Sequence, residues 1–474
     1  MKIRKVLVPG RFVVIHPGHM RLFQTAKELG DYTVVALNTE GLTNYEIDWR
    51  TKLLNAISGV EEVVTFRSNI EDLLLQIKPD FLLKGSEFAK VKNPEEVILN
   101  KHGGKLIFSP GAYYSTESAD FEIAKKLIKF DVFENSGEYI SRNEIVQEKL
   151  LKILDDISKV RTCVIGDLIV DEIINCHPIG MSQEEPTIVA KPVDSTRFIG
   201  GAGIVAAHAE ALGSKTTFIT VVGADSIADW SRTKLLENVS KLVAFKDPNR
   251  PTTLKQKFKS GKQILLKLTD AKNDLVPHDL ELAILEYFSK NAANFDLLIL
   301  SDFSFGIFTD YLAGELIKIA KNNSIFIAAD SQFSSQIGNL EKFKGADLVT
   351  PTEFEARSEL KDEMSGLVVL AEKLRIKMDA KFILLKLGAD GLLLNGVDDR
   401  GNAIRTDRLP ALNNNPVDAS GAGDSLLASS ALVLANGESI YYASLIGSIA
   451  AGIQISRPGN VPIDAKTLQG LISK

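Results

Sequence analysis

The chain has 474 residues, of which 45% are hydrophobic and 24% charged, enough for two or three domains with sizeable cores. Its formal net charge of −6 provides no general basic field, so we expect neither a nucleic acid nor a membrane surface as partner. Two cysteines, Cys163 and Cys176, are too few for a disulfide framework, and arginine, proline and glycine interrupt the apolar N-terminal start. We therefore expect a soluble cytoplasmic protein.

The chain begins with an alternation of short apolar runs and helical patterns that extends over residues 1–130. YTVVAL at 32–37 and FLLKG at 81–85 are examples of the apolar runs. This alternation predicts one α/β domain with a parallel, Rossmann-like sheet. Residues 131–159 are polar at first and become periodic from Ile145 to Ile157, which predicts a linker helix.

The stretch GRFVVIHPGH at 10–19 joins the first apolar run to a helical pattern that starts near Met20. His16 and His19 therefore flank a helix N-terminus, where backbone N–H groups and the helix dipole favour an anion such as phosphate. Two other interpretations stay open at this point. One is a metal site, for which nothing nearby supplies a third ligand, and the other is a pair of ordinary surface histidines.

A second, larger alternation of apolar runs and helical patterns occupies residues 160–474. DLLILSDF at 296–303 and FILLKLGADG at 382–391 are typical buried strands that end in a turn. Three more polar, alternating stretches, at 171–180, 186–195 and 252–268, predict antiparallel edge strands. Because exposed edge strands normally need covering, we expect them to form a small β lid that also pairs two subunits into a homodimer.

Two glycine-rich stretches precede helical patterns in this second domain. GGAGIVA at 200–206 contains G-x-G-x-x-A, which leaves a dinucleotide fold and an NAD-dependent oxidoreductase open. In the stretch 413–437, Gly421-Ala422-Gly423 lets backbone N–H groups converge at a helix start, as a transferring phosphoryl group requires. Asp424 follows directly, where a carboxylate can take the proton of an attacking hydroxyl. The alternative is a helix start with Asp424 as its cap.

The motifs of both domains resemble those of known families. GRF and HPGH resemble the H-x-G-H region of the cytidylyltransferase-like nucleotidyltransferases, and NPVDASGAGD resembles the D-[TV]-x-G-A-G-D signature of the ribokinase-like sugar kinases. VIGDLIVDE at 164–172, GGAG at 200–203 and LGADG at 387–391 are similar to further kinase motifs. Together the two domains resemble the bifunctional heptose-phosphate kinase/nucleotidyltransferases that make ADP-heptose. The usual fusion has the kinase first, whereas this chain begins with the transferase.

The resemblance implies a role for particular residues. In the kinase, Asp424 is the base, Gly421, Ala422 and Gly423 form the anion hole, and the sugar site contains Asp167, Asp171, Gly200, Gly201 and Lys255. The kinase nucleotide is held by Glu355, Gly388 and Gly391. In the transferase, His16 and His19 serve catalysis, and the nucleotide is bound by Gly10, Arg11, Phe12, Arg50, Lys84, Gly85, Ser115 and Thr116.

The resemblance also implies the reactants. ATP enters with Mg²⁺, which is held by the nucleotide and reaches Glu355 only through water. The resulting sugar 1-phosphate is joined to a second nucleoside triphosphate, ATP or CTP, and pyrophosphate leaves. The ligands are a sugar phosphate and nucleotides.

The sequence departs from the family patterns at several positions. Ile204 replaces the asparagine of the sugar-kinase pattern G-G-A-x-N, the magnesium-associated N-x-x-E element keeps only Glu355, and Lys386 replaces a threonine. In the first domain, the segment 38–50 is short and acidic where relatives carry a basic loop, and Arg50 is its clearest cation. An alternative function is therefore a sugar kinase with a degenerate nucleotide-binding first domain.

Overall fold

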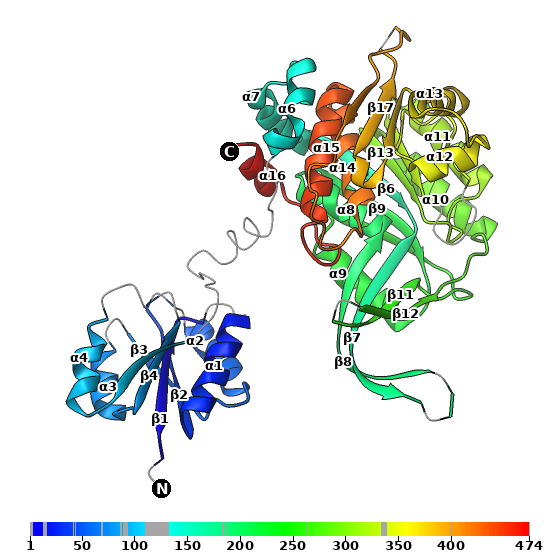
Figure 1. Ribbon diagram of the computed structural model, residues 1–474. Coiled ribbons are helices and arrows are strands. Elements are labelled where there is room, and N and C mark those ends of the chain that lie inside the picture. Colours follow the sequence, from blue (N-terminus) through cyan, green and yellow to red (C-terminus); the bar gives the residue numbers. More distant parts are fainter. Residues whose placement is uncertain are drawn as a thin grey trace. The chain divides into compact units, whose positions relative to one another are not determined.

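The structure is a computed structural model of the whole chain, which divides into two compact units, residues 1–127 and 128–474 (Figure 1). The boundary lies close to the predicted end of the first domain. The residues that the structure describes are 3–12, 17–40, 42, 44–67, 70–85, 88, 93–109, 132–182, 184–185, 187–261, 263–332, 339–398 and 400–473. Within these residues, no helix combines the length and apolar character needed to cross a membrane.

The first unit contains a five-stranded sheet in the order β3-β2-β1-β4-β5, and all its strands are parallel, as predicted. Its strands are β1 (Lys5–Gly10), β2 (Tyr32–Asn38), β3 (Glu62–Phe66), β4 (Phe81–Gly85) and β5 (Lys105–Ser109). Its helices are α1 (Pro17–Leu29), α2 (Asn44–Asn55), α3 (Glu71–Ile77) and α4 (Glu95–Lys101). The strand order reverses between β1 and β4, and ligands of open parallel sheets bind at such a reversal, beyond the carboxyl ends of the strands.

The core of the first unit lies on both faces of β1, because successive strand residues point to opposite sides. Val6 and Val8 pack with Phe23 and other residues on one face, and Leu7 packs with Leu74 and its neighbours on the other. Both faces of the central strand are therefore buried, as the continuous apolar run predicts.

The segment predicted as a linker helix is instead part of the second unit. It forms two helices, α6 (Val132–Arg142) and α7 (Gln147–Asp156), and a short 3₁₀ helix, η2 (Ile157–Lys159). Tyr139 is 1% exposed and belongs, with Val132, to the same core cluster as helices near the C-terminus. The Tyr139 hydroxyl donates to the carbonyl oxygen of Tyr441 at 3.1 Å. Although the segment starts with polar residues, it carries an apolar stripe at helical spacing, and that stripe packs into the core of the second unit.

The second unit is built on a nine-stranded sheet in the order β10-β9-β6-β13-β14-β15-β16-β17-β18. The strands from β10 to β16 run parallel, whereas β17 and β18 are antiparallel to their neighbours. The strands are β6 (Arg161–Gly166), β9 (Lys215–Val222), β10 (Lys241–Lys246), β13 (Leu297–Asp302), β14 (Phe326–Ser331), β15 (Leu348–Val349), β16 (Phe382–Lys386), β17 (Leu392–Gly396) and β18 (Asp407–Leu409).

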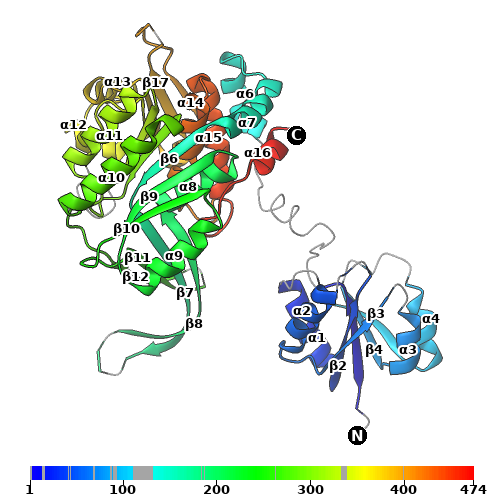
Figure 2. The ribbon, with the colours of Figure 1, turned by 180° about the vertical axis from the view of Figure 1, so that it is seen from behind.

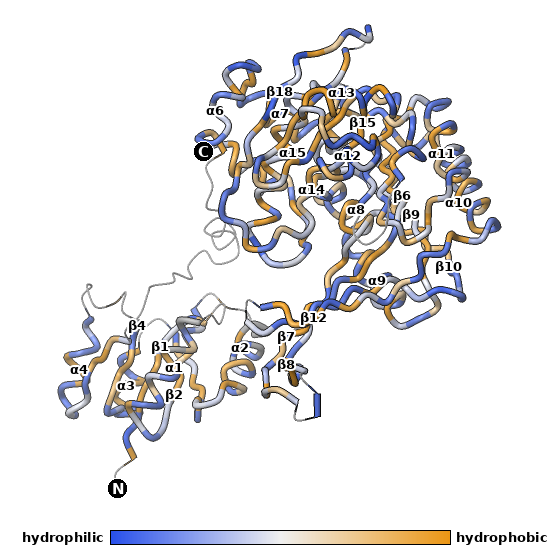
Figure 3. Tube along the Cα trace, turned by 45° about the vertical axis from the view of Figure 1, so that its right-hand side comes forward, coloured by the Kyte–Doolittle hydropathy of each residue, from blue (hydrophilic) through white to orange (hydrophobic). Residues whose placement is uncertain are grey.

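Helices cover both faces of this sheet (Figures 1 and 2). One core contains residues of α8, α14 and α15 together with Val164 of β6, and the other contains residues of α10, α11 and α13 together with Ile165. Figure 3 shows hydrophobic stretches along the buried strand β6. The helices are α8 (Ala202–Ala211), α9 (Ser226–Leu236), α10 (His278–Asn291), α11 (Asp310–Asn322), α12 (Glu353–Leu360), α13 (Leu367–Met378), α14 (Ala422–Ala435), α15 (Ile440–Gln454), α16 (Ala465–Ile472) and the 3₁₀ helices η3 (Ala292–Asn294), η4 (Glu341–Phe343) and η5 (Gly388–Asp390).

The predicted β lid is present as a four-stranded sheet in the order β12-β11-β7-β8. Its strands are β7 (Leu168–Met181), β8 (Ile188–Gly201), β11 (Leu254–Ser260) and β12 (Gln263–Asp270), and the β7–β8 ribbon extends away from the rest of the unit (Figure 1). The prediction that all pairings are antiparallel was wrong, because β11 runs parallel to β7. The main-sheet strands that precede β7 and β11 in the chain, β6 and β10, are both parallel to β9.

Candidate active site

Polar residues gather where the parallel strands of the second unit end. Asp167 follows β6, Asp302 ends β13, Asp330 lies near the end of β14, and Lys386 ends β16. The carboxyl ends of parallel strands meet at one edge of a sheet, which is the usual ligand site of such folds. All four side chains are mostly buried, so their charges interact in a poorly solvated region.

The glycine turn before α14 has the conformation that an anion hole requires. Gly421 has φ +76° and is the N-cap of α14, and a Cβ at this position would lie 2.4 Å from Asn460 Oδ1. A larger residue would therefore be both strained and sterically excluded. The helix begins at Ala422, so the backbone N–H groups of its first turn lack intrahelical partners, as the sequence predicts.

Asp424 lies in the first turn of α14 and is 5% exposed. Its Oδ1 atom makes no hydrogen bond within the described part of the chain, and no side chain caps the helix, so the interpretation of Asp424 as a cap is wrong. Burial raises the pKa of Asp424 to about 7, and the nearby carboxylate of Asp330 acts in the same direction. A carboxylate with this pKa is suited to accept a proton near neutral pH.

The side chain of Asn460 lies between Asp171, on the lid strand β7, and the glycine turn. Asp171 Oδ2 accepts a hydrogen bond from Asn460 Nδ2 at 3.2 Å, and a Cβ at Gly200 would lie 2.3 Å from the same oxygen. Gly200 therefore leaves room for the carboxylate. Burial raises the pKa of Asp171, and Lys255 opposes that shift. Asp171, Gly200 and Asn460 thus form one wall of a polar site.

Lys255 brings a positive charge to this wall. It lies on β11 directly opposite Asp171 in the lid sheet, and its Nζ atom is 5.0 Å from the centre of the Phe305 ring. Burial lowers the pKa of Lys255, whereas the carboxylates of Asp171 and Asp424 oppose the shift. Lys255 therefore lies within electrostatic reach of both the sugar-side carboxylate and the candidate base.

Asp167, the other carboxylate predicted to bind sugar, has a structural task. Its Oδ2 accepts the backbone N–H of Phe303 at 2.9 Å and of Phe305 at 3.3 Å, and its Oδ1 accepts that of Ile307 at 3.4 Å. Burial, followed by the charge of Asp302, raises the pKa of Asp167 to about 7. The carboxylate therefore holds the loop that follows β13, in addition to any sugar contact that the resemblance implies.

The glycine pair predicted to bind sugar does not belong to a dinucleotide fold. Gly200 and Gly201 end the lid strand β8, which is antiparallel to β7. A dinucleotide fingerprint requires a strand of a parallel sheet before its glycine turn. Gly201 instead has φ +59° and lies close to the main-chain oxygen of Asp167, where a Cβ would be 2.4 Å away. The oxidoreductase alternative loses its structural basis.

A cavity of about 140 Å³ adjoins the glycine turn, and none of its lining residues belongs to a lid strand. It brings together the predicted nucleotide residues Gly388 and Gly391 with Ala422 and Gly423, and Lys386 also lines it. Its apolar lining includes Leu392, Leu412, Leu426 and Ile455. A pocket with a mainly apolar body and a helix N-terminus at one end suits a nucleotide.

Glu355 lies near this cavity but does not line it. Its side chain accepts the backbone N–H of Thr352 at 2.6 Å, and its own N–H donates to Thr352 Oγ1 at 3.2 Å, which makes a capping box at the start of α12. The described residues contain no group of three or more His, Cys, Asp or Glu side chains placed to hold a metal ion.

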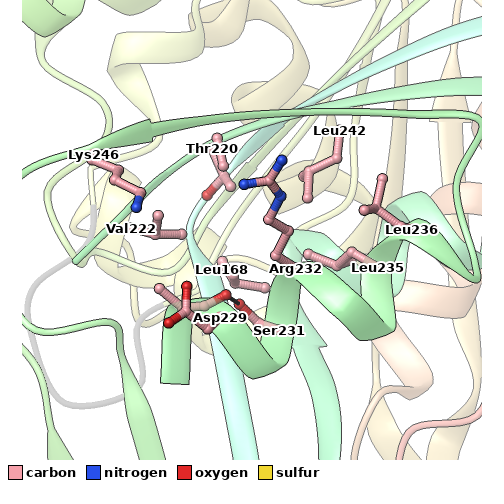
Figure 4. Close-up of a pocket in the computed structure, with 12 residues that line it drawn as sticks. Leu168, Thr220, Val222, Asp229, Ser231, Arg232, Leu235, Leu236, Leu242 and Lys246 are labelled. Carbon is pink, nitrogen blue, oxygen red and sulfur yellow. Dashed lines mark hydrogen bonds between the residues drawn. The ribbon is translucent and has the colours of Figure 1, made fainter. Parts of the chain in front are cut away.

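A second cavity, of about 190 Å³, lies between α9 and strands β9 and β10 (Figure 4). Arg232 and Lys246 are at its polar side, over an apolar floor that includes Leu168 and Leu235. None of its lining residues belongs to the glycine turn, to the wall formed by Asp171, Gly200 and Asn460, or to the nucleotide cavity. This cavity is therefore separate from the candidate active site.

In the first unit, the GRF segment folds back against α1. Phe12 has φ +46° and is 2% exposed, and its ring centre is 5.1 Å from that of His19. A Cβ at Gly10 would lie 2.7 Å from Phe12 Cζ, so glycine is needed where β1 ends. His19 thus lies in the first turn of α1, as predicted, whereas His16 is outside the described residues.

The predicted cations of the first unit are engaged with protein groups. Arg50 is 6% exposed, and its Nη1 donates to the carbonyl oxygen of Arg11 at 3.1 Å, while Arg11 Nη2 donates to the carbonyl oxygen of Glu40 at 2.9 Å. Arg50 was predicted to be a further donor to the nucleotide. It is buried, and its hydrogen bond supports the GRF segment.

Lys84 and Gly85 lie at the end of β4, beside the strand-order reversal. Lys84 Nζ donates to Glu95 Oε1 at 2.7 Å and to Asn93 Oδ1 at 3.0 Å, and both partners of the ion pair are mostly buried. Its charge is therefore largely balanced within the protein. The predicted donors Ser115 and Thr116 lie outside the described residues.

Sequence reasoning missed the roles of Asn460 and Asp330, and it noted Lys386 only as a departure from a pattern. Asp330 ends an apolar run, and polar residues at such strand ends are a signal that sequence reasoning can use. Asn460 lies in a loop far from any motif, and only the fold brings it to Asp171 and Gly421.

Comparisons with known proteins assign both units. Residues 160–466 match the family described as pfkB family carbohydrate kinase, and residues 7–147 match the one described as cytidylyltransferase-like. The transferase-like match precedes the kinase match. The predicted reversal of this order relative to the bifunctional enzymes is not confirmed by these matches, because they do not give the domain order of the relatives.

Relatives named bifunctional protein HldE are similar to this chain. The protein of Desulfatibacillum aliphaticivorans is 30% identical over 319 residues, which cover 66% of this chain and 63% of the relative. That of Campylobacter fetus is 28% identical over 322 residues, which cover 66% and 67%. This chain therefore aligns with less than two thirds of the length of the first relative.

Solved structures show the same fold. The ribokinase of Arabidopsis thaliana, complexed with ribose and ATP, has a TM-score of 0.53 at 18% identity and covers 67% of this chain and 99% of its own. Phosphofructokinase-2 of Escherichia coli, in complex with potassium, has a TM-score of 0.54 at 16% identity and covers 66% and 98%. The chain is thus a two-domain α/β protein with an N-terminal nucleotidyltransferase-like domain and a C-terminal ribokinase-like fold.

Proposed function

We propose that this chain, which belongs to the pfkB family of carbohydrate kinases, is a bifunctional enzyme of nucleotide-sugar synthesis. The second unit transfers a phosphoryl group from ATP to a heptose-like sugar or sugar phosphate. The first unit then joins the sugar 1-phosphate to a nucleotide, supplied by ATP or CTP, and releases pyrophosphate. Both steps consume nucleoside triphosphates, in keeping with a cytoplasmic setting. The observation that carries the proposal is the buried Asp424 between a polar sugar-side wall and a nucleotide-side cavity.

In the first step, a sugar hydroxyl attacks the γ-phosphorus of ATP. The new O–P bond forms as the bond to the bridging β,γ-oxygen breaks, and Asp424 accepts the hydroxyl proton. The N–H groups at the start of α14 stabilise charge on the transferring group. Asp171 and Asn460 position the sugar hydroxyls, and Lys255 attracts a phosphate already carried by the sugar.

Mg²⁺ fits this site as an ion that arrives with ATP. The described residues offer no three-ligand cluster, and the carboxylate of Glu355 is occupied in its capping box. Glu355 would therefore reach the ion through water. When bound, Mg²⁺ neutralises charge on the phosphate oxygens.

In the second step, the sugar 1-phosphate attacks the α-phosphorus of the second nucleotide directly, so no enzyme nucleophile is needed. His16 and His19, with the start of α1, would donate to the phosphates as charge develops. Gly10, Arg11, Phe12 and Gly85 lie near the strand-order reversal where such a nucleotide binds.

A second candidate function is a sugar kinase whose first unit only binds a nucleotide. The burial of Arg50 and the pairing of Lys84 with Glu95 favour it, since both remove positive charge from the transferase site. Incubation of purified protein with sugar phosphates and each nucleoside triphosphate, read by mass spectrometry and pyrophosphate release, separates the two. A nucleotide-sugar with pyrophosphate supports the bifunctional enzyme, a phosphorylated sugar alone supports the kinase, and neither product contradicts both.

Sugar phosphorylation is expected to depend on pH through Asp424. Only the ionised carboxylate accepts a proton, and burial, aided by Asp330, raises its pKa to about 7, although Lys386 and Lys255 oppose the shift. The turnover number should therefore rise with pH and level off above about 7. Steady-state rates at saturating substrates test this. A rate that stays constant between about pH 5 and 9 would contradict the assignment.

The lid is expected to pair two copies of the chain into a dimer. Ile264, Leu266 and Leu268 alternate along β12 and are 46–55% exposed, and Val193 of β8 is 69% exposed. Such an apolar sheet face normally requires a cover. Light scattering should show a dimer at least, and Leu266→Lys should shift it toward monomer. A wild-type monomer with full kinase activity would contradict this prediction.

A further inference from the structure

Lys386 is a buried cation that is fixed at the end of β16. Its Nζ atom donates to both carboxylate oxygens of Asp330, at 2.9 and 3.1 Å, and the two side chains are 14% and 3% exposed. Thr350 Oγ1 donates to Asp330 Oδ1 at 3.0 Å. Asp330 is therefore held in turn, and the ammonium group has a defined position.

This position is directly beside the start of α14. The Nζ atom lies 3.4 Å from the point that a Cβ at Gly423 would occupy. Lys386 also lines the nucleotide cavity with Gly388, Gly391 and Ala422. The ammonium group thus lies where the cavity meets the N–H groups of the glycine turn. An anionic group bound at that turn would come within reach of it.

We infer that Lys386 is a further catalytic residue, which contacts the γ-phosphoryl group of ATP and neutralises charge on it during transfer to the sugar. Asp330 is the positioning residue that fixes its ammonium group. The inference rests on the kinase function proposed above. Lys386 gains and loses no proton: the sugar oxygen forms the new bond to phosphorus, ADP leaves, and Asp424 takes the proton.

The charge on Lys386 is suited to this role. Burial acts to lower its pKa, but the carboxylates of Asp330 and Glu355 outweigh burial, and the pKa is raised overall. Lys255, in contrast, has a lowered pKa. A lysine that stays protonated acts as a compact positive charge, which phosphate groups bind strongly.

A purely structural ion pair is the competing explanation, because a buried Lys–Asp pair also stabilises its own geometry. Lys386→Gln alone would leave Asp330 charged and unpaired, so loss of activity could reflect unfolding. The double variant Asp330→Asn/Lys386→Gln removes both charges and can retain a hydrogen bond. The matched control is Lys377→Gln/Glu359→Gln, which neutralises another ion pair of this unit, 2.5 Å long, outside the site.

Three measurements test the inference: thermal unfolding, the turnover number of sugar phosphorylation, and calorimetric binding of adenosine, ADP and β,γ-methylene-ATP. The double variant should unfold near the wild-type temperature yet lose about a hundredfold or more in turnover, the scale of one lost transition-state donor. Its affinity for β,γ-methylene-ATP should fall about tenfold more than its affinity for adenosine. The control should keep wild-type turnover and binding.

The outcomes are distinguishable. If the double variant keeps the wild-type turnover number, or binds adenosine, ADP and β,γ-methylene-ATP as wild type does, the inference about Lys386 is wrong and the ion pair is structural. If wild type phosphorylates no sugar, the proposed function fails, and the difference between triphosphate and adenosine binding still decides whether Lys386 contacts the phosphates. The inference about Lys386 is supported if the control variant keeps wild-type turnover and binding while the double variant loses turnover and affinity for β,γ-methylene-ATP.

Discussion

Asp424→Asn is expected to lower sugar phosphorylation by a factor of about 10² to 10⁴, the range for a positioned general base. The carboxylate is 5% exposed, and its Oδ1 makes no hydrogen bond within the described residues, so that oxygen is not engaged by a protein donor and can accept a proton. Asparagine has the same size and lacks the basic oxygen. Steady-state kinetics with the sugar identified by mass spectrometry measures the loss.

The same variant distinguishes a loss of catalysis from a loss of folded protein. Removal of a buried charge should leave the unfolding temperature unchanged or raise it, because burial disfavours the ionised form of Asp424. Asp310→Asn is a suitable control, since Asp310 also lies in the first turn of a helix but is exposed. Supplied sugar 1-phosphate should restore the second reaction. Wild-type phosphorylation by a stable Asp424→Asn protein would show that the base is wrongly assigned.

The strands and the glycine turn were predictable because their causes are local. Val6 to Val8 form an apolar run that fits a strand buried on both faces, and Gly421 stands where the backbone has φ +76° against Asn460. Both features can be recognised in the sequence without knowing which distant residues contact them. The position of Asp424 in the first turn of α14 follows from the same turn.

The helices α6 and α7 were misassigned because their partners lie far away in the sequence. Arg142 pairs with Asp407 at 2.7 Å, and Val146 donates its N–H to the hydroxyl of Tyr442 at 3.0 Å. A polar surface pattern alone does not show which domain a helix packs against. The apolar stripe that includes Tyr139 was the available signal.

The roles of charged site residues were only partly predictable, because charge pairing depends on the fold. Arg50 and Lys84 were predicted to bind the nucleotide; in the structure the first is buried and donates to the carbonyl of Arg11, and the second is paired with Glu95. Asp167 was chosen from a motif, and its three backbone partners lie in the loop after β13. A residue type shows which contacts are possible, whereas the fold decides which are made.

The histidines of the first unit provide the test of the second reaction. Changing His16 or His19 to Ala is expected to lower nucleotidyl transfer by about a hundredfold or more, the scale for one lost donor to a developing charge. His19 also packs against the Phe12 ring, so His19→Gln, which keeps a donor, separates lost hydrogen bonding from lost packing. Sugar phosphorylation should persist, because every described residue assigned to that step lies in the second unit.

His102→Gln is the control within the first unit: His102 contacts the carbonyl of Pro79 at 3.2 Å and is assigned no role in transfer. Pyrophosphate release from supplied sugar 1-phosphate measures the step, and a double His16→Ala/His19→Ala variant that transfers nucleotide at the wild-type rate would show that these histidines do not serve the transition state.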